Sequence, residues 1–261
     1  MLVSIFLWTI ISKKYKIIQY RKFLKLLDKE NDVRDEGESM NALERKRKSI
    51  EILKANKVPY MEGLPLIEDV NDIEVRSEEE IAKRAIACLI SIQVACDINS
   101  GENIEESKEF FQGVLGKYAV REELSDNEKK IIFGNPENQE VINMIWKYEA
   151  YWILIWALGI VDKLEYPSQI CDCDFAIHSV MDCEDFNDFM KTVKLRSIDE
   201  ILDEADLIYR YNWACVDARI HGKNAPAGLD SGVVFERHWG LNWLIGKGTY
   251  NDNWDSVSTD T

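Results

Sequence analysis

The sequence lacks the short motifs that assign a reaction. It contains no glycine-rich phosphate loop, no nucleophile elbow and no dinucleotide fingerprint along its 261 residues. Paired C-x-x-C and H-x-x-x-H elements are missing, and so are the Glu-x-x-His pairs of di-iron helix bundles. These absences leave no reaction class with a recognisable signature, and no cofactor is expected.

The cysteines also fit no common metal-binding pattern. Four possible ligands, Cys171, Cys173, His178 and Cys183, lie within thirteen residues, which raises the question of a zinc site. Their order, C-x-C followed by a histidine and then a cysteine, lacks the paired spacing of zinc ligands, so we predict no metal site. The other three cysteines stand in apolar helical runs and look like reduced core residues of a cytosolic protein: Cys88, Cys96 and Cys215.

Positive charge is scarce beyond the first part of the chain. Residues 1–57 hold 14 Lys and Arg against 8 Asp and Glu, whereas residues 58–261 hold 18 against 39, a net charge of −21. A nucleic-acid-binding surface needs a basic footprint to neutralise phosphates, so nucleic acid is excluded as a partner. An acidic body stays in solution and can attract a basic partner.

A long apolar run is missing as well. The apolar N-terminal segment covers only residues 1–11, whereas a membrane span needs roughly twenty apolar residues. It is followed by a segment in which Lys and Arg alternate with apolar residues. Two interpretations of residues 1–27 remain open: a basic amphipathic helix on a membrane surface, or an accessory helix packed on the domain. We predict a cytoplasmic protein, with peripheral membrane contact as the alternative.

The remaining pattern predicts a helical protein. Residues 29–41 are charged and almost free of apolar side chains, so we place an N-terminal extension and linker at 1–41 and one compact domain at 42–261. Capping boxes, in which a serine and a glutamate three residues later satisfy free N–H groups, mark three helix starts: Ser77 with Glu80, Ser125 with Glu128, and Ser197 with Glu200. The first and third follow an arginine, a recurrence that we interpret as a repeated capping device.

The fold class expected is all-α or nearly so, with a central pair of apolar helices and at most a few short strands. A long apolar helix is predicted over 138–161, and a second helix over 198–221 with Gly222 as its C-terminal cap. The stretch 169–180 is assigned to a short strand or irregular structure, and a last helix to 233–245.

Charged side chains occur among the apolar ones on these helices. At 100° per residue, one stripe of the 198–221 helix carries Asp206, Arg210, Trp213 and Asp217. Isolated buried ions are costly, and the acidic and basic groups nearly balance, so we predict a salt-bridge network between helices. Its other members are Glu149, Arg219, Glu236, Arg237 and His238.

An enzymatic alternative uses the same groups. Glu149 or Glu236 could act as a general acid with a raised pKa, and His238 as a base, in a tryptophan-lined pocket. For Glu149 the rival interpretation is a buried partner of Arg210 or Arg237. The alternative function is therefore a hydrolase.

Four segments are distinctive: "WKYEAYWILIWALG", "LRSIDEILDEADLIYRYNWACVDAR", "GVVFERHWGLNWLI" and the ending "WDSVSTDT". Together they resemble the bacterial family called domain of unknown function 4272, and the resemblance covers about residues 42–261. It implies no activity, but its motif positions coincide with the charged and aromatic groups above, and they add Trp156 and Asn242. The net charge of −21 on residues 58–261 and the absence of a nucleophile or metal-ligand set lead us to expect a non-enzymatic immunity- or regulatory-type protein that binds another protein. Glu149, Glu236 and His238 are the catalytic candidates if it is an enzyme.

Overall fold

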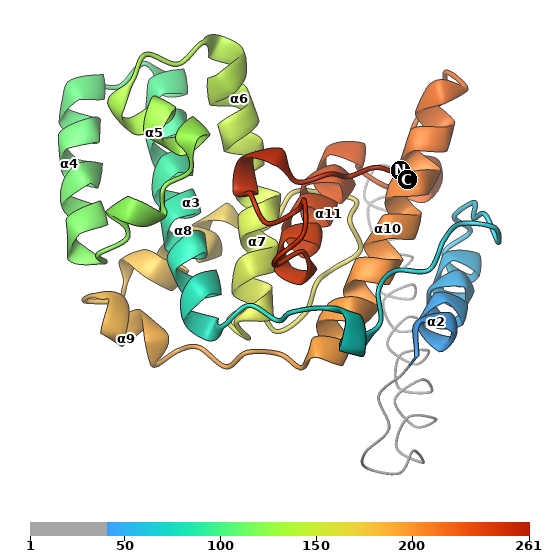
Figure 1. The fold of residues 1–261 in the computed structure, drawn as a ribbon. Helices are drawn as coiled ribbons and strands as arrows, with labels where there is room; N and C mark the ends of the chain where they lie inside the picture. Colours follow the sequence, from blue (N-terminus) through green and yellow to red (C-terminus); the bar gives the residue numbers. More distant parts are fainter. Residues whose placement is uncertain (1–40) are drawn as a thin grey trace, which may run out of the picture. The chain divides into compact units, whose positions relative to one another are not determined.

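The structure, a computed structural model, describes residues 41–261, and every regular element in that range is helical (Figure 1). The α-helices are α2 (Ala42–Ala55), α3 (Glu78–Ser100), α4 (Ile104–Lys117), α5 (Asp126–Phe133), α6 (Asn138–Trp146), α7 (Tyr148–Ala157), α8 (Cys173–Met181), α9 (Phe186–Met190), α10 (Ile198–Ile220) and α11 (Ser231–Ile245). Short 3₁₀ turns lie at Val70–Asp72, Arg121–Glu123, Pro226–Gly228 and Trp254–Ser256. The all-α prediction is confirmed. The predicted extension and its membrane contact lie outside the described residues, apart from Asn41.

All three predicted capping boxes are present. Ser77, Ser125 and Ser197 precede α3, α5 and α10, and in each case the serine and the glutamate bond to each other's backbone N–H. Gly222 follows α10 in the left-handed conformation, at φ +67°, and ends that helix as predicted. These devices depend only on local sequence.

Two predicted elements are wrong. The stretch assigned to strand or irregular structure contains α8, whose start is capped by the Asp172 side chain accepting from Phe175 N–H at 3.0 Å. The single long helix expected over 138–161 is two helices, because the chain turns at Lys147 between α6 and α7. The side chain of Lys147 reaches Glu236 on α11, a contact that sequence periodicity does not reveal.

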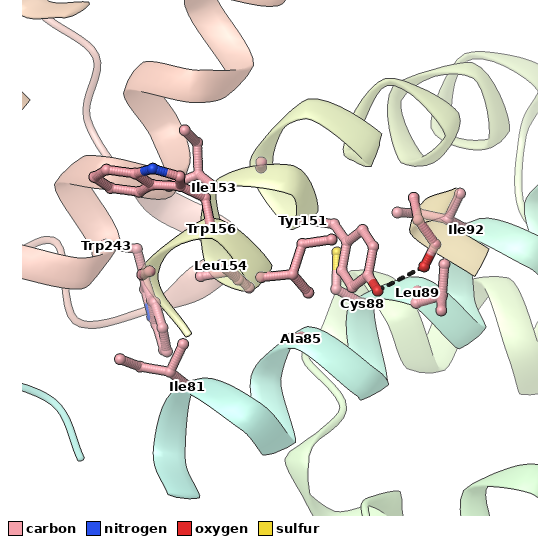
Figure 2. Packing of buried hydrophobic residues seen from close by; sticks show 14 of the residues in the cluster. Ile81, Ala85, Cys88, Leu89, Ile92, Tyr151, Ile153, Leu154, Trp156 and Trp243 are labelled. Carbon is pink, nitrogen blue, oxygen red and sulfur yellow. Dashed lines mark hydrogen bonds between the residues drawn. The ribbon is translucent and has the colours of Figure 1, made fainter. Parts of the chain in front are cut away.

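The core contains four helices that succeed one another in the order α3, α7, α11, α10 (Figure 1). Figure 2 shows Ile81, Ala85 and Leu89 of α3 beside Leu154 and Tyr151 of α7. In the centre, α7 and α11 approach closely at Gly240, where an added Cβ would lie 2.9 Å from the carbonyl oxygen of residue 150. Within residues 41–261, no helix has both the length and the apolar composition needed to cross a membrane.

The central helices share a sequence pattern. The segment 148–159, YEAYWILIWALG, aligns with 235–246, FERHWGLNWLIG, so that Glu, two Trp, Leu and Gly coincide. The outer helices also match, since each begins after an Arg-Ser pair with a glutamate three residues beyond the serine. The recurrence therefore extends beyond a repeated capping device, because it pairs α3 with α10 and α7 with α11.

The two arginines that precede the capping boxes form equivalent contacts across the core. Arg76, before α3, donates from Nε to the Trp243 carbonyl at 2.8 Å and lies over the Trp243 ring at 3.8 Å. Arg196, before α10, donates from Nε to the Trp156 carbonyl at 2.9 Å and lies over the Trp156 ring at 4.9 Å. Trp156 and Trp243 occupy the same position of the shared pattern. We call these contacts the two arginine clasps; each ties an outer helix to the C-terminal end of a central one.

Candidate functional site

Glu149 is buried in the centre of the protein. It stands in the first turn of α7 with 1% of its side chain exposed. One carboxylate oxygen accepts from Arg237 Nε at 2.9 Å, and the other accepts from the Cys171 backbone N–H at 2.5 Å. Arg237, on α11, also donates to the Glu165 carbonyl at 2.7 Å. Of the two arginines considered for Glu149, Arg237 is thus the partner, and the pair ties α7 to α11.

Glu236 forms a second tie between the same helices in the opposite sense. Its carboxylate, on α11, lies 2.9 Å from the Nζ atom of Lys147, the residue between α6 and α7. The ammonium also lies over the Trp239 ring, 3.5 Å from its centroid, in a cation–π contact. Burial raises the pKa of Glu236, and Lys147 opposes that shift.

Asp206 and Arg210 pair with each other within α10. Arg210 donates from Nε and Nη2 to the two carboxylate oxygens, at 2.8 and 2.6 Å, and both side chains are buried. Among residues 41–261, Arg210 forms a hydrogen bond outside its own helix only with the Pro65 carbonyl, 3.5 Å away. The predicted network is therefore divided into separate pairs, because residues four apart on one helix satisfy each other locally.

The predicted stripe becomes exposed toward the end of α10. Trp213 is half-buried, and the Asp217 side chain is 40% exposed and lies 3.5 Å from His221 Nδ1. Arg219 is exposed and forms no ion pair with any residue in 41–261. Only the first half of the stripe belongs to the core.

His238 is buried and neutral. The Asn242 side-chain amide donates to His238 Nε2 at 3.0 Å and to the Ser258 carbonyl at 2.8 Å, which places the ring proton on Nδ1. Nδ1 has no hydrogen-bond partner among residues 41–261. Burial lowers the pKa of His238 to about 3. With its lone pair occupied and its pKa this low, the imidazole is unsuited to act as a base near neutral pH.

Two adjoining cavities form a groove along the outer face of α11. One, of about 910 Å³, lies among α6, α10, α11 and the C-terminal residues, and the other, of about 450 Å³, extends toward α5. They share Asn143, Phe235 and Glu236. We call this the α11 groove. Its aromatic lining consists of Trp146, Phe235, Trp239 and Trp254.

Large apolar side chains are exposed in the α11 groove. Trp146 is 41% exposed and Phe235 is 39% exposed. The rings of Phe235 and Trp239 lie 6.1 Å apart, and Trp146 packs against Gly232, so the aromatic surface is continuous with α11. Exposed clusters of this kind in folded proteins commonly mark binding surfaces.

The three catalytic candidates do not share a cavity. Glu236 borders the α11 groove, whereas His238 borders a separate cavity of about 220 Å³ with Tyr209 and Asn242. Glu149 lines none of these cavities and is closed by Arg237. A single pocket combining Glu149 or Glu236 with His238 is therefore absent from the described cavities.

The four residues considered as zinc ligands, Cys171, Cys173, His178 and Cys183, do not converge on one point. His178 is exposed and lies 3.0 Å from Asp182, while Cys183 is buried near Tyr118. Within 41–261, no three His, Cys, Asp or Glu side chains converge as ligands of a metal ion.

Sequence reasoning missed several residues of the site. Lys147 is the only basic residue in the predicted apolar helix, and this signal could have suggested that it pairs with a buried carboxylate. Trp146 and Phe235 gave no signal, because their exposure depends on how α6 and α11 meet. Glu204 also gave no signal. It lies in α10, two residues before Asp206, where it is half-buried, and burial raises its pKa to about 7.

These observations define the class of protein. It is an all-α domain whose helices are held together by buried ion pairs and by the two arginine clasps. The family model described as Domain of unknown function (DUF4272) matches residues 45–257, and the chain belongs to that family. The match confirms the resemblance inferred from its segments. No curated protein and no solved structure shows significant similarity to the chain.

Proposed function

We propose that the domain is a non-enzymatic module that binds another protein through the α11 groove. The observation that carries the proposal is the exposure of Trp146 and Phe235 beside an open cavity. Aromatic residues are enriched in protein interfaces and supply much of their binding energy. The module acts as an immunity- or regulatory-type protein in the cytoplasm, where its six free cysteines stay reduced.

The state of the ionisable groups supports binding over catalysis. Glu149 and Asp206 each meet an arginine in the core, and the lone pair of His238 is occupied by Asn242. Groups closed in this way stabilise helix contacts, and none of the described cavities combines Glu149 or Glu236 with His238. Because these ionisable groups are already paired, we infer that the α11 groove serves mainly to bind a partner.

The partner that fits the groove is a basic protein with an exposed apolar side chain. Residues 58–261 carry a net charge of −21, which speeds the approach of a positively charged molecule. In the 450 Å³ part of the groove the carboxylates Glu140, Glu236 and Asp255 outnumber the cation Lys147. An apolar side chain would pack on Phe235 and Trp239, with Lys or Arg beside it.

Affinity capture with matched variants tests the proposal. The full chain and its Phe235→Ala and Ile220→Ala variants are immobilised at low and high salt. Ile220 is 72% exposed but lies outside the groove, so it is the control. We expect a basic protein to be retained by the wild type and Ile220→Ala, with its Kd raised about tenfold or more by Phe235→Ala. Equal binding to both variants, or no stoichiometric partner even at low salt, contradicts the proposal.

One observation favours a second candidate function, a hydrolase. Glu236 lies where the two cavities meet, and its raised pKa suits a general acid. In that case Lys147 would tune the carboxyl group and the Trp and Phe side chains would bind the substrate. A panel of chromogenic esters and glycosides tests it: turnover that is abolished by Glu236→Gln supports the hydrolase, and turnover that survives this change rules out Glu236 as the acid.

A further inference from the structure

Two asparagine side chains bind the main chain of residues 257–261, which we call the tail. Asn212 of α10 donates from its side-chain amide to the Thr259 carbonyl at 2.9 Å. Asn242 of α11 donates in the same way to the Ser258 carbonyl at 2.8 Å. We call these two amides the asparagine pair. The tail therefore joins α10 and α11 through two successive main-chain carbonyls (Figure 1).

The internal recurrence of the sequence shows that helix packing does not require these amides. Counted from the two Arg-Ser pairs, Asn212 corresponds to Ile92 of α3, and in the aligned central segments Asn242 corresponds to Ile155 of α7. Both isoleucines are fully buried, and Figure 2 shows Ile92 in the core. A buried polar group without a partner costs about 1–3 kcal/mol. The asparagine pair is therefore explained by the carbonyls that it binds.

The tail is anchored at its start and lies at the surface beyond that point. Val257 is buried, whereas Asp260 and Thr261 are exposed. The Ser258 N–H donates to the Asn251 side chain at 2.8 Å, and the Ser258 hydroxyl donates to the Asp260 carboxylate at 2.8 Å. A surface segment held by a small number of hydrogen bonds opens at a low free-energy cost.

The tail also borders the α11 groove. The cavity of about 910 Å³ is bordered by residues 259–261 and Asn212, and also by Trp146 and Phe235. The tail and the exposed aromatic side chains thus face one cavity, and a partner segment bound there meets the tail. Binding of an extended peptide through its main-chain hydrogen-bonding groups is a recurring mode of protein recognition.

We propose that the asparagine pair is a main-chain binding site for an extended peptide segment of the partner, and that the tail occupies this site as an intramolecular competitor. The inference rests on the proposed function, because the partner in the α11 groove supplies the segment. Its carbonyls replace those of Ser258 and Thr259. The tail itself indicates the side chains that fit, which are small hydroxyl residues beside an aspartate. A docked tail lowers the apparent affinity for the segment, since only the open fraction of the protein can bind it.

Fluorescence anisotropy with a labelled peptide of residues 256–261, SVSTDT, tests the proposal on the full chain. The variant Ser258→Pro weakens the tail, because it removes the N–H that donates to Asn251 and the hydroxyl that donates to Asp260. It leaves the asparagine pair unchanged. We expect the peptide to bind this variant with a Kd at least about tenfold lower than that of the wild type. Equal Kd values for the two proteins overturn the competition.

Further variants in the Ser258→Pro background identify the binding groups. Asn212→Ile and Asn242→Ile each remove one hydrogen bond and introduce the residue found at the equivalent position of the other half. Each should raise the peptide Kd about fivefold or more. Asn224→Ala is the matched control and should leave the Kd unchanged, because Asn224 is exposed and borders the same cavity without bonding to the tail. Peptide binding that survives both isoleucine substitutions overturns the assignment of the site.

A measurement on the wild type keeps the proposal testable if Ser258→Pro does not fold. In the ¹⁵N-labelled full chain, a large excess of unlabelled peptide should displace the tail. The amide resonances of Thr259 and Thr261 should then move to positions typical of an unstructured chain, and resonances that stay in place overturn the proposal. Neither measurement uses the partner. Failure to capture a basic protein therefore contradicts the proposed function, whereas failure of the peptide to bind contradicts only the role of the asparagine pair.

Discussion

Glu149 and Arg237 meet at 2.9 Å between α7 and α11, with 1% and 4% of their side chains exposed. Neither charge is balanced by another ion pair among the described residues. The carboxylate accepts a backbone N–H as well, and the guanidinium donates to a backbone carbonyl. Glu149 and Arg237 therefore balance each other's charge. Removing either side chain leaves the other as an unpaired charge in the core.

Removing the charge of Glu149 is expected to destabilise the fold. Glu149→Gln leaves Arg237 buried without a counter-ion, which costs about 3–5 kcal/mol of unfolding free energy. Urea denaturation measures the loss. Asp217→Asn, which alters an exposed pair, is the control and should change stability by less than about 0.5 kcal/mol. An unchanged midpoint for Glu149→Gln contradicts a stabilising role for this ion pair.

The two arginine clasps should contribute comparable amounts. Arg76→Ala and Arg196→Ala each remove a charged hydrogen bond to a tryptophan carbonyl and a cation–π contact, so each should cost about 2–3 kcal/mol. Lysine lacks the planar fork and should restore little. Because the clasps share no partner, the double variant should be additive within about 0.5 kcal/mol. Chemical denaturation of the four proteins decides this, and a loss confined to one arginine contradicts the equivalence.

His238 makes stability depend on pH in the acidic range. Its folded pKa of about 3 lies below the ordinary 6.5, so the unfolded chain binds more protons between these values. Stability therefore falls as pH is lowered below 6.5, by about 2 kcal/mol between pH 7 and pH 5. The quantity to measure is the difference between wild type and His238→Gln, since other groups titrate equally in both. A pH-independent difference contradicts a neutral buried imidazole.

Glu204 should show the opposite dependence. Burial raises its pKa to about 7, and it forms no ion pair or hydrogen bond with residues 41–261. Folding then favours the protonated form, so this carboxyl reduces stability as pH rises through 7. Glu204→Gln should stabilise the protein at pH 8 by on the order of 1–2 kcal/mol, allowing for its partial exposure, and by little at pH 5. Thermal melts at both pH values test the prediction.

The sequence predicted what local chemistry determines. Serine and glutamate three residues apart predict the starts of α3, α5 and α10, because both groups lie within one helical turn. The family resemblance was also visible, since it depends on linear segments. The carboxylates were expected to need partners because isolated buried charges are costly, and Glu149, Asp206 and Glu236 each lie in an ion pair.

The features that were missed depend on contacts between residues far apart in the sequence. At the turn between α6 and α7, Lys147 contacts Glu236, which lies 89 residues away in the sequence. The apolar run before and after Lys147 carries no sign of this contact, so it looked like one helix. Helical periodicity placed Asp206 and Asp217 on one stripe, but the depth of each residue depends on neighbouring helices. The α11 groove has no linear signature, because α6, α10 and α11 meet there from separate parts of the chain.

The arginine clasps also bear on how the chain can be divided. Arg76 belongs to the half that contains α3 and α7 but closes on Trp243 of the other half, and Arg196 closes on Trp156 in return. A cut in the exposed connection at residues 191–192 would separate each arginine from the tryptophan it binds. Each fragment would then carry the group that completes the other, so the two should fold by reassociating as a two-chain complex rather than alone.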